Sequence, residues 1–172
     1  MLEDPRFLSQ EKVPSEAVIG FSRKTGYECL SNFYMSSVPF EGTLYPSVEH
    51  AYQAAKSLDP TTRRLIKSAK DPNAAKRLGQ SVTVRVDWTE VRVDVMRQLI
   101  KEKFKNPFIR WKLKETVGKR LVNENRWNDT FWGVTRGIGE NWLGKILEEV
   151  REEILTEDSA DLIEFPNNEV LS

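Results

Sequence analysis

The chain has 172 residues, 39% of them hydrophobic and 30% charged, which is a composition typical of a globular protein. This length is enough for one domain with a hydrophobic core, but it is short for two. It contains no apolar run near the roughly 18 residues that cross a bilayer, and its first ten residues lack the basic-then-apolar order of a signal peptide. The single cysteine, Cys29, excludes an intramolecular disulfide, so we expect a cytoplasmic protein without membrane contact.

The formal net charge is zero, but the charges are unevenly placed along the chain. Residues 156–172 carry acidic side chains and no basic one, whereas residues 61–77 and 97–120 are rich in lysine and arginine. Such basic segments either bind phosphate groups or are solvated helix faces. With one cysteine and one histidine, the chain is not expected to build a zinc site, and we predict neither a metal nor a cofactor.

The first predicted elements are short extended segments at residues 17–22 (AVIGFS) and 37–46 (SVPFEGTLYP), the second with a tight turn that uses the flexibility of Gly42. Pro46 suits the first turn of a helix, which we expect Pro60 to end. The apolar stripe of this helix, at helical spacing, consists of Val48, Ala51, Ala55 and Leu58.

Three further helices are predicted before residue 106. Two are short, at residues 61–69 (TTRRLIKSA) and 73–79 (NAAKRLG). The clearest begins at Asp87, where Asp87 and Glu90 have the spacing of a capping box, and continues through residue 105. Its core-facing side chains should be Val91, Val95, Leu99 and Ile100, with Met96 and Phe104 at the edge.

Beyond Pro107, which follows that helix, we predict a helix at residues 108–115 and a last one at 141–155. The last should bury Leu143, Ile146, Leu147, Val150 and Ile154. The predicted fold is therefore mainly α, a single multihelical domain over residues 1–155 with a few short β-strands near the N-terminus. Residues 156–172 should form an acidic tail, mobile or loosely docked.

The segment PSVEHAYQAAK, residues 46–56, places a second group of side chains on neighbouring helical turns: Glu49, Tyr52, Gln53 and Lys56. On a helix, Glu49 and Lys56 point about 20° apart and lie roughly 10 Å apart along the axis. That is too far for an ion pair but suits an acid and an amine on two sides of a small molecule. The alternative is an ordinary solvated face, and His50 is read as a packing residue.

Residues 127–145 (WNDTFWGVTRGIGENWLGK) combine three tryptophans, four glycines and an Asn-Asp pair. Glycine allows a backbone to approach a ligand, aromatic rings stack on bases, and the helix beginning near Asn141 could direct N–H groups at a phosphate. Equally, the tryptophans could be core and the glycines turns. In AAKRLGQSV, Arg77 could bind a phosphate or a carboxylate, or be a surface arginine.

Six segments of the sequence together resemble the motifs of one protein family: LSNFY, FEGTLYPSVEHAYQAAK, AAKRLGQ, DWTEVRVDVMRQLIKEKF, FWG and NWLGKILEEVREE. In this order and spacing, over residues 19–155, the chain resembles the NADAR family, also called the YbiA-like N-glycosidases. The resemblance implies a mainly helical YbiA-like fold and hydrolysis of a C–N glycosidic bond. Members of that family act on phosphoribosylamino-pyrimidine intermediates of riboflavin synthesis or remove ADP-ribose from guanine bases. Either substrate would be the partner, free or within nucleic acid.

The family motif positions fall on Asn32 and Phe33, Glu49, Lys56, Arg77 with Gly79, Asp87 with Trp88, Asp129 with Trp132 and Gly133, and Asn141 through Lys145. We therefore predict a catalytic set of Lys56, Glu49 and Asp129. The predicted substrate-binding set is Asn32, Phe33, Tyr52, Arg77, Trp88, Trp132, Gly133, Asn141 and Lys145.

Both substrate kinds join ribose C1 to an exocyclic amine, so the sugar ring can open to an imine that a neutral Lys56 could attack. Glu49 or Asp129 would transfer protons. Arg77, with Lys145, would hold phosphate, and Trp88 or Trp132 would stack on the base. In a competing mechanism, Glu49 activates water directly, assisted by Asp129, and Lys56 only binds substrate.

A different class of function is a sensor module that binds a nucleotide or ADP-ribose without hydrolysis. The zero net charge and the lack of a known nucleic-acid-binding motif disfavour a generic RNA- or DNA-binding protein.

Overall fold

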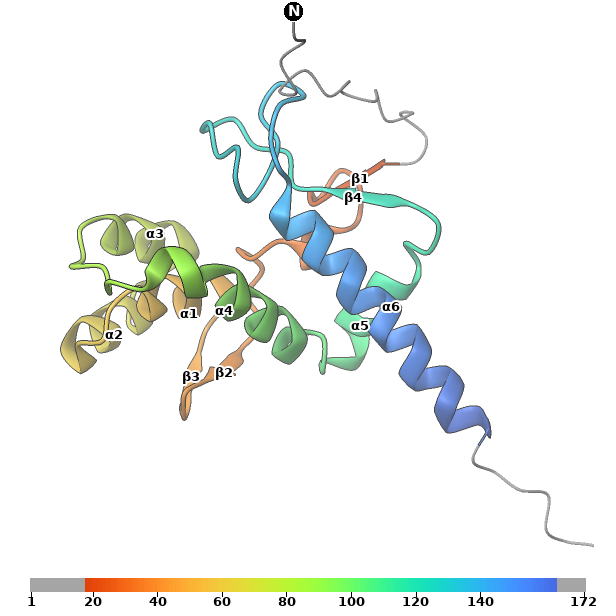
Figure 1. Ribbon diagram of the computed structural model, residues 1–172, viewed down its shortest axis with the longest axis horizontal. Coiled ribbons are helices and arrows are strands. Elements are labelled where there is room, and N and C mark those ends of the chain that lie inside the picture. Colours follow the sequence, from red (N-terminus) through yellow and green to blue (C-terminus); the bar gives the residue numbers. More distant parts are fainter. Residues whose placement is uncertain (1–17, 164–172) are drawn as a thin grey trace, which may run out of the picture.

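The computed structural model describes residues 18–163, which are mainly helical with a few short strands (Figure 1). Along the chain, the elements are β1 (Val18–Gly20), η2 (Glu28–Leu30), β2 (Val38–Phe40), β3 (Thr43–Tyr45), α1 (Val48–Ala55), α2 (Pro60–Lys67), α3 (Pro72–Gln80), α4 (Trp88–Lys103), α5 (Pro107–Lys114), β4 (Arg120–Val122) and α6 (Trp142–Ile163). This order confirms the predicted mainly α fold, but β4 lies far in the sequence from the N-terminal region in which all the short strands were predicted.

The strands form two separate pairs. β1 pairs in parallel with β4, with Ile19 opposite Leu121, and β2 pairs with β3 in an antiparallel hairpin. The hairpin turn has φ of 45° at Glu41 and 74° at Gly42. Because φ near +70° strains a residue with a Cβ, Gly42 fits the second position, and the predicted turn is confirmed.

Helix α1 lies within a group of elements at one end of the molecule, where α2, α3 and α4 and the β2–β3 hairpin all contact it (Figure 1). All eight of its residues are buried. The alternative of an ordinary solvated face is therefore wrong, because this helix has neighbours on every side. Leu58, predicted to extend the apolar stripe, lies beyond the helix and is 66% exposed.

Two predictions about proline are wrong, as the first residues of α1 and α2 show. Ser47 caps α1, its hydroxyl accepting from the backbone N–H of His50 at 3.3 Å, so Pro46 precedes the helix and is not in its first turn. Helix α1 ends at Ala55, and Pro60 starts α2 instead of stopping α1. Three helices begin with an Asp or Asn cap followed directly by a proline: α2 at Asp59-Pro60, α3 at Asp71-Pro72 and α5 at Asn106-Pro107.

Helix α4 confirms most of its predicted core face but not its predicted cap, and Met96 and Phe104, predicted at the edge of that face, are fully buried. The carboxylate of Asp87 accepts from the Arg85 guanidinium at 2.6 and 2.7 Å and makes no hydrogen bond to the helix N-terminus. The ion pair with Arg85 thus replaces the capping box. Val91 is partly buried, and the fully inward side chains are Val95, Met96, Leu99, Ile100 and Lys103.

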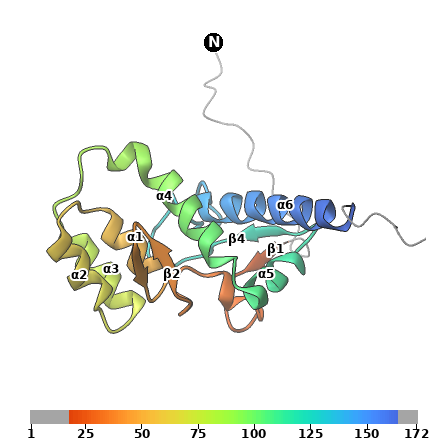
Figure 2. The ribbon, with the colours of Figure 1, turned by 90° about the horizontal axis from the view of Figure 1, so that it is seen from below.

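Helix α6 lies along the β1–β4 pair and contacts α4 and α5 (Figure 2). Its predicted core face is confirmed, because Leu143, Ile146, Leu147, Val150 and Ile154 are all buried. The helix continues to Ile163, past the end predicted near residue 155. Its Glu157 and Asp158 pair with Arg110 and Lys114 of α5 instead of belonging to a mobile tail. The rest of that tail, 164–172, lies outside the described residues.

None of the helices within residues 18–163 is long and apolar enough to cross a bilayer.

Candidate active site

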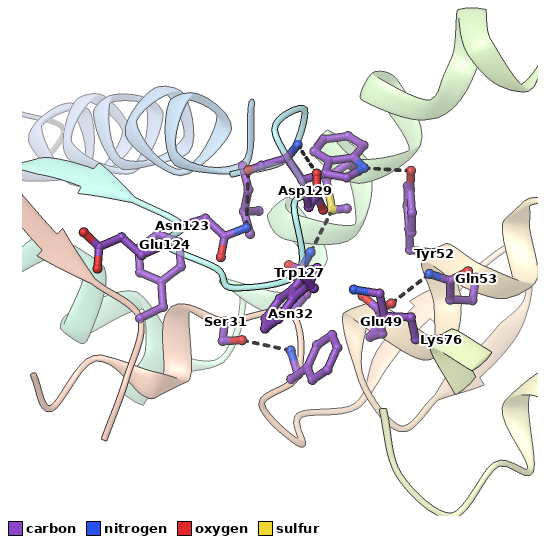
Figure 3. A pocket seen from close by; sticks show the side chains of 15 residues that line it. Ser31, Asn32, Glu49, Tyr52, Gln53, Lys76, Asn123, Glu124, Trp127 and Asp129 are labelled. Carbon is purple, nitrogen blue, oxygen red and sulfur yellow. Dashed lines mark hydrogen bonds between the residues drawn. The ribbon is translucent and has the colours of Figure 1, made fainter. Parts of the chain in front are cut away.

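A cavity of about 160 Å³ lies where α1 meets two loops, the one after η2 and the one between β4 and α6 (Figure 3). Side chains of α1 enter it from one side, and those of the β4–α6 loop enter from the other. It is lined by Phe21, Ser31, Asn32, Phe33, Glu49, Tyr52, Gln53, Lys76, Met96, Asn123, Glu124, Trp127, Asp129, Trp132 and Leu143. The site therefore combines segments that are far apart in the sequence.

Glu49, in the first turn of α1, is the most deeply placed acid of the cavity and is only 5% exposed. Its Oε1 accepts from Gln53 Nε2 at 2.8 Å, and its backbone N–H donates to Asn32 O at 3.1 Å. Burial raises the pKa of the Glu49 carboxyl; the Gln53 hydrogen bond and the charges of two lysines oppose this rise, and Asp129 adds to it. A carboxyl in this environment can hold a proton closer to neutral pH.

Gln53 is held against Glu49 by the close approach of α3 to α1. A Cβ added to Gly79 of α3 would lie 2.0 Å from Gln53 Oε1 and 2.8 Å from Gln53 Cβ. Only glycine allows this contact. Gly79, predicted as a motif residue, therefore acts through packing, one layer behind the cavity.

Asp129, the second predicted acid, is fixed by its own loop. The Asn125 side chain donates to Asp129 O at 2.7 Å and accepts from its backbone N–H at 3.0 Å, and Asn128 takes a φ of 60°. The Asp129 Oδ1 in turn accepts from the Trp132 N–H at 2.8 Å. These bonds hold the carboxylate at the cavity wall, facing the same space as Glu49.

Tyr52 and Trp132 form one rigid wall of the cavity. The indole N–H of Trp132 donates to the Tyr52 hydroxyl at 3.0 Å, and the two rings meet edge to face at 5.4 Å. Burial raises the pKa of the Tyr52 hydroxyl, so it stays neutral. Trp88, predicted to contact the base, packs on Tyr52 with centroids 5.1 Å apart and does not line the cavity.

Asn32 has an unusual feature for a buried amide. Its Nδ2 lies 3.4 Å from Met96 Sδ, and its Oδ1 is buried without a hydrogen-bond partner in the described part of the chain. A buried acceptor left unpaired costs free energy unless something donates to it. Because Asn32 lines the cavity, its Oδ1 is suited to accept from a bound hydroxyl or amine.

Lys56, the predicted nucleophile, is beside the cavity and not in its wall. Its Nζ donates to Gly79 O at 3.4 Å and lies 5.8 Å from the Tyr52 ring centre. Burial lowers the pKa of the Lys56 ammonium; Glu49 opposes this effect and Lys76 adds to it. The lysine has the depressed pKa that the imine mechanism requires, but its ammonium would have to leave Gly79 to reach a ligand.

Four other predicted site residues lie elsewhere. Arg77 is exposed on α3, and Lys145 is exposed on α6 over the Trp142 ring. Asn141, with a φ of 56°, is structural: its side chain donates to Leu121 O at 2.8 Å and accepts from the backbone N–H of Asn123. Gly133 is buried, and a Cβ there would lie 2.1 Å from Asn123 O. Asn141 and Gly133 thus shape the loop and do not touch the cavity.

Sequence reasoning missed several cavity residues, most notably Lys76 and Trp127. Lys76 stands next to Arg77 in the same motif, and one step along a helix turns a side chain by about 100°, so only one of the two can face α1. Trp127 begins the aromatic segment that was singled out, but nothing local distinguishes it from the other tryptophans. The remaining missed residues are Phe21, Ser31, Met96, Asn123, Glu124 and Leu143, whereas Gln53 belonged to the polar stripe of residues 46–56 without being predicted to bind substrate.

His50 is fully buried, with its ring nitrogens bonded to Ser47 Oγ and Ala69 O, which agrees with its reading as a packing residue. Over residues 18–163, no three or more His, Cys, Asp or Glu side chains gather as a metal site would require.

Comparisons with known proteins agree with this architecture. The NADAR domain model matches residues 20–155. The N-glycosidase YbiA of Escherichia coli is 34% identical over 152 residues, covering 86% of this chain and 94% of YbiA. An N-glycosidase of Nostoc punctiforme is 40% identical over 135 residues, covering 74% of this chain and 86% of that protein.

One further relative and one solved structure extend the comparison. A riboflavin biosynthesis protein of Vibrio vulnificus is 39% identical over 140 residues, and this chain spans only 38% of its length. The solution structure of E. coli YbiA superposes with a TM-score of 0.76 at 32% identity, covering 91% of this chain and 94% of that one. With a family model over most of the chain and a matching fold, the protein belongs to the NADAR family.

Proposed function

We propose that this protein is an N-glycosidase that hydrolyses the bond between ribose C1 and an exocyclic amine of a base. The observation that carries the proposal is Glu49, a buried carboxyl with a raised pKa that shares one cavity with the carboxylate of Asp129. Glycosidases commonly use two carboxyl groups whose pKa values differ because their environments differ. One carboxyl can then donate a proton while the other accepts one. The relatives named N-glycosidase support the same activity.

The substrate is a phosphorylated ribosylamine. One candidate is a phosphoribosylamino-pyrimidine intermediate of riboflavin synthesis, which the name of the Vibrio relative favours. The other is ADP-ribosylated guanine, either free or within nucleic acid. In both, ribose hydroxyls would meet the unpaired Oδ1 of Asn32.

In the route that the cavity lining favours, protonated Glu49 donates its proton to the leaving nitrogen as the C1–N bond breaks. Asp129 accepts a proton from the water that attacks C1, so the products are the free sugar and the neutral amine of the base. Trp132 orients Asp129 through its backbone N–H, and Gln53 orients Glu49.

A second route within the same function uses Lys56. The ribosylamine opens to an imine, the neutral Lys56 amine attacks C1, the base amine departs, and water hydrolyses the resulting enzyme imine to regenerate the lysine. The lowered pKa of Lys56 supports this route. Its present hydrogen bond to Gly79 O means that the side chain would have to rotate toward the ligand.

The first experiment incubates the protein with both substrates in parallel, ADP-ribosylated guanine being supplied in single-stranded DNA, and identifies the products by mass spectrometry. Release of ribose 5-phosphate or of ADP-ribose supports the proposal and selects the substrate. If neither is cleaved by the folded protein while ADP-ribose binds, the chain is a binding module instead.

Borohydride added during turnover then separates the two routes. A reduced adduct on Lys56 establishes the imine, and a Lys56→Arg variant should then lose turnover. Turnover without an adduct, retained in Lys56→Arg, establishes direct attack by water.

A further inference from the structure

Three side chains that line the cavity have no part in the chemistry above: Phe33 and Lys76, which are partly buried, and Trp127, which is exposed. They come from three separate segments, the loop after η2, helix α3 and the β4–α6 loop. All three line the same cavity as Glu49, and the charge of Lys76 acts on the Glu49 carboxyl (Figure 3). The fold thus brings two aromatic rings and a cation together beside the acid at which the glycosidic bond would break.

The two rings are nearly parallel, with 16° between their planes and 6.5 Å between their centroids. This separation is at the long end of the range for direct aromatic pairs. The Lys76 ammonium lies over both rings, with Nζ 4.6 Å from the Trp127 centroid and 5.7 Å from the Phe33 centroid. The arrangement presents flat aromatic surface and three N–H donors at one place.

Folding alone gives little reason for this cluster. Trp127 is 58% exposed and is not among the side chains of the hydrophobic core. Lys76 forms no ion pair with a carboxylate of the described residues, so its ammonium interacts mainly with aromatic faces. The backbone on both sides is nevertheless fixed, because Ser31 Oγ accepts from the N–H of Phe33 and Asn125 Oδ1 accepts from that of Trp127. An exposed indole on a fixed backbone beside a cavity is suited to a ligand.

The other tryptophans near the site are less available. Trp132 already donates its indole N–H to Tyr52, and its ring contacts Tyr52 and Phe131 edge to face. Trp88 does not line the cavity. The aromatic surface that a base could cover therefore belongs to Phe33 and Trp127, and not to the tryptophans that the sequence predicted for this role.

We propose that Phe33 and Trp127 hold the flat ring of the leaving base and that Lys76 donates to an oxo group or ring nitrogen on its edge. The proposal rests on the function proposed above, because it needs the base amine to lie next to Glu49. The ligand class is an amino-substituted heterocycle with an acceptor edge, such as an aminopyrimidinone or guanine. Lys76 and Trp127 then favour aromatic over aliphatic ribosylamines.

The test measures binding of a base without its sugar, so it does not depend on turnover. The probe is 2,4-diamino-6-hydroxypyrimidine, titrated calorimetrically against wild type, Trp127→Ala, Trp127→Phe and Lys76→Met. Trp127→Ala should bind the probe roughly tenfold to a hundredfold more weakly, the effect of losing one stacked base, and Trp127→Phe only a few-fold more weakly. Lys76→Met should weaken binding several-fold.

The chain offers a matched control for Trp127. Trp111 on α5 is also exposed, at 51%, lies against Phe108 and is outside the cavity. Trp111→Ala should bind the probe like wild type. Binding of ribose 5-phosphate should be equal in all variants, since a collapsed site would lose both ligands. In steady-state kinetics, Trp127→Ala should raise KM with little change in kcat.

Two results would overturn the subsite: unchanged affinity of Trp127→Ala for the base, or equal losses for the base and for ribose 5-phosphate. Failure of the proposed function looks different. In that case the wild type still binds the base and the Trp127→Ala substitution still weakens this binding, but neither ribosylated substrate is cleaved.

Discussion

Glu49 illustrates how the surroundings of one side chain determine its chemistry. In isolation, a glutamate in the first turn of a helix would be ionised and would stabilise the positive end of the helix dipole. Here α2, α3 and α4 enclose α1, and burial raises the pKa of the carboxyl while Gln53 supplies one hydrogen bond. The same residue thereby becomes able to hold a proton for a leaving group.

A Glu49→Gln variant should lose about 10²- to 10⁴-fold in kcat/KM, because the amide keeps the shape but cannot transfer a proton. Its stability should be preserved or improved, since it removes a buried ionisable group. The folded pKa of Glu49 lies above its unfolded value, so the wild type loses stability relative to the variant as pH rises from about 4.5. Urea unfolding at several pH values and steady-state kinetics measure both effects.

Glu90→Gln, on the exposed side of α4, is the matched control and should change neither activity nor stability. Full turnover by Glu49→Gln would remove Glu49 from the proton-transfer step.

The contact between α1 and α3 shows how two short helices position the site together. Both begin with a local signal, Ser47 for α1 and Asp71-Pro72 for α3. Their close approach depends on Gly79, which leaves room for the Gln53 side chain. The orientation of Glu49 is thus linked to the packing of a helix that contains no proposed catalytic acid.

A Gly79→Ala variant should force α3 away from α1, because the new Cβ would overlap both ends of the Gln53 side chain. We expect a loss of about 1–3 kcal/mol in the free energy of unfolding and a clear fall in kcat, since Gln53 can no longer hold Glu49. Chemical denaturation and kinetics measure the two losses.

Gly20→Ala is the control, because nothing lies within 4 Å of a Cβ there. If Gly79→Ala matched the wild type in rate and stability, Gln53 would have no positioning role.

Lys103 connects distant parts of the whole molecule. Its side chain is 1% exposed, and its Nζ donates to Ser31 O at 2.6 Å, joining the end of α4 to the loop that carries Asn32 and Phe33. Burial lowers the pKa of this lysine to about 7, an effect that the nearby Cys29 opposes. The protein therefore retains a costly buried amine at a position that supports the cavity.

This lysine should make the stability of the protein depend on pH. Between about pH 7 and 10.5 the unfolded chain keeps the proton that the folded chain has lost, so the free energy of unfolding should rise with pH, by up to about 1.4 kcal/mol per pH unit. A Lys103→Met variant should lack this rise. Unfolding is measured from pH 7 to 8, because the Cys29 thiol titrates near 9.0 in the unfolded chain and burial raises its pKa in the folded one.

Lys105→Met, at an exposed lysine two residues away, should keep the wild-type pH dependence. Parallel curves for wild type and Lys103→Met would show that Lys103 does not titrate in this range.

Signals within a few residues of each other were enough to predict the mainly helical class, the order of the six helices, the turn at Gly42 and most of the inward faces of α4 and α6, but not strand β4. Periodicity, caps and turn residues act locally, so they can be read without a partner. The same signals misplaced Pro46 and Pro60, because a proline can follow one helix or start the next. The polar stripe of residues 46–56 and the resemblance to the NADAR family, taken together, supplied the candidates that line one cavity: Asn32, Phe33, Glu49, Tyr52, Asp129 and Trp132.

The features that the sequence did not predict depend on packing between helices and strands that are distant in the sequence. Whether α1 has a solvated face depends on α2, α3, α4 and the β2–β3 hairpin that cover it, and none of these contacts is specified by the sequence of α1. Whether Lys76 or Arg77 enters the cavity depends on the rotation of α3, which Gly79 and Gln53 fix across a helix contact. Residue types and local periods therefore decided which side chains were available for chemistry. Only the tertiary structure decided which of them meet, because one residue of helix changes a direction by about 100° and that rotation is set by contacts distant in the sequence.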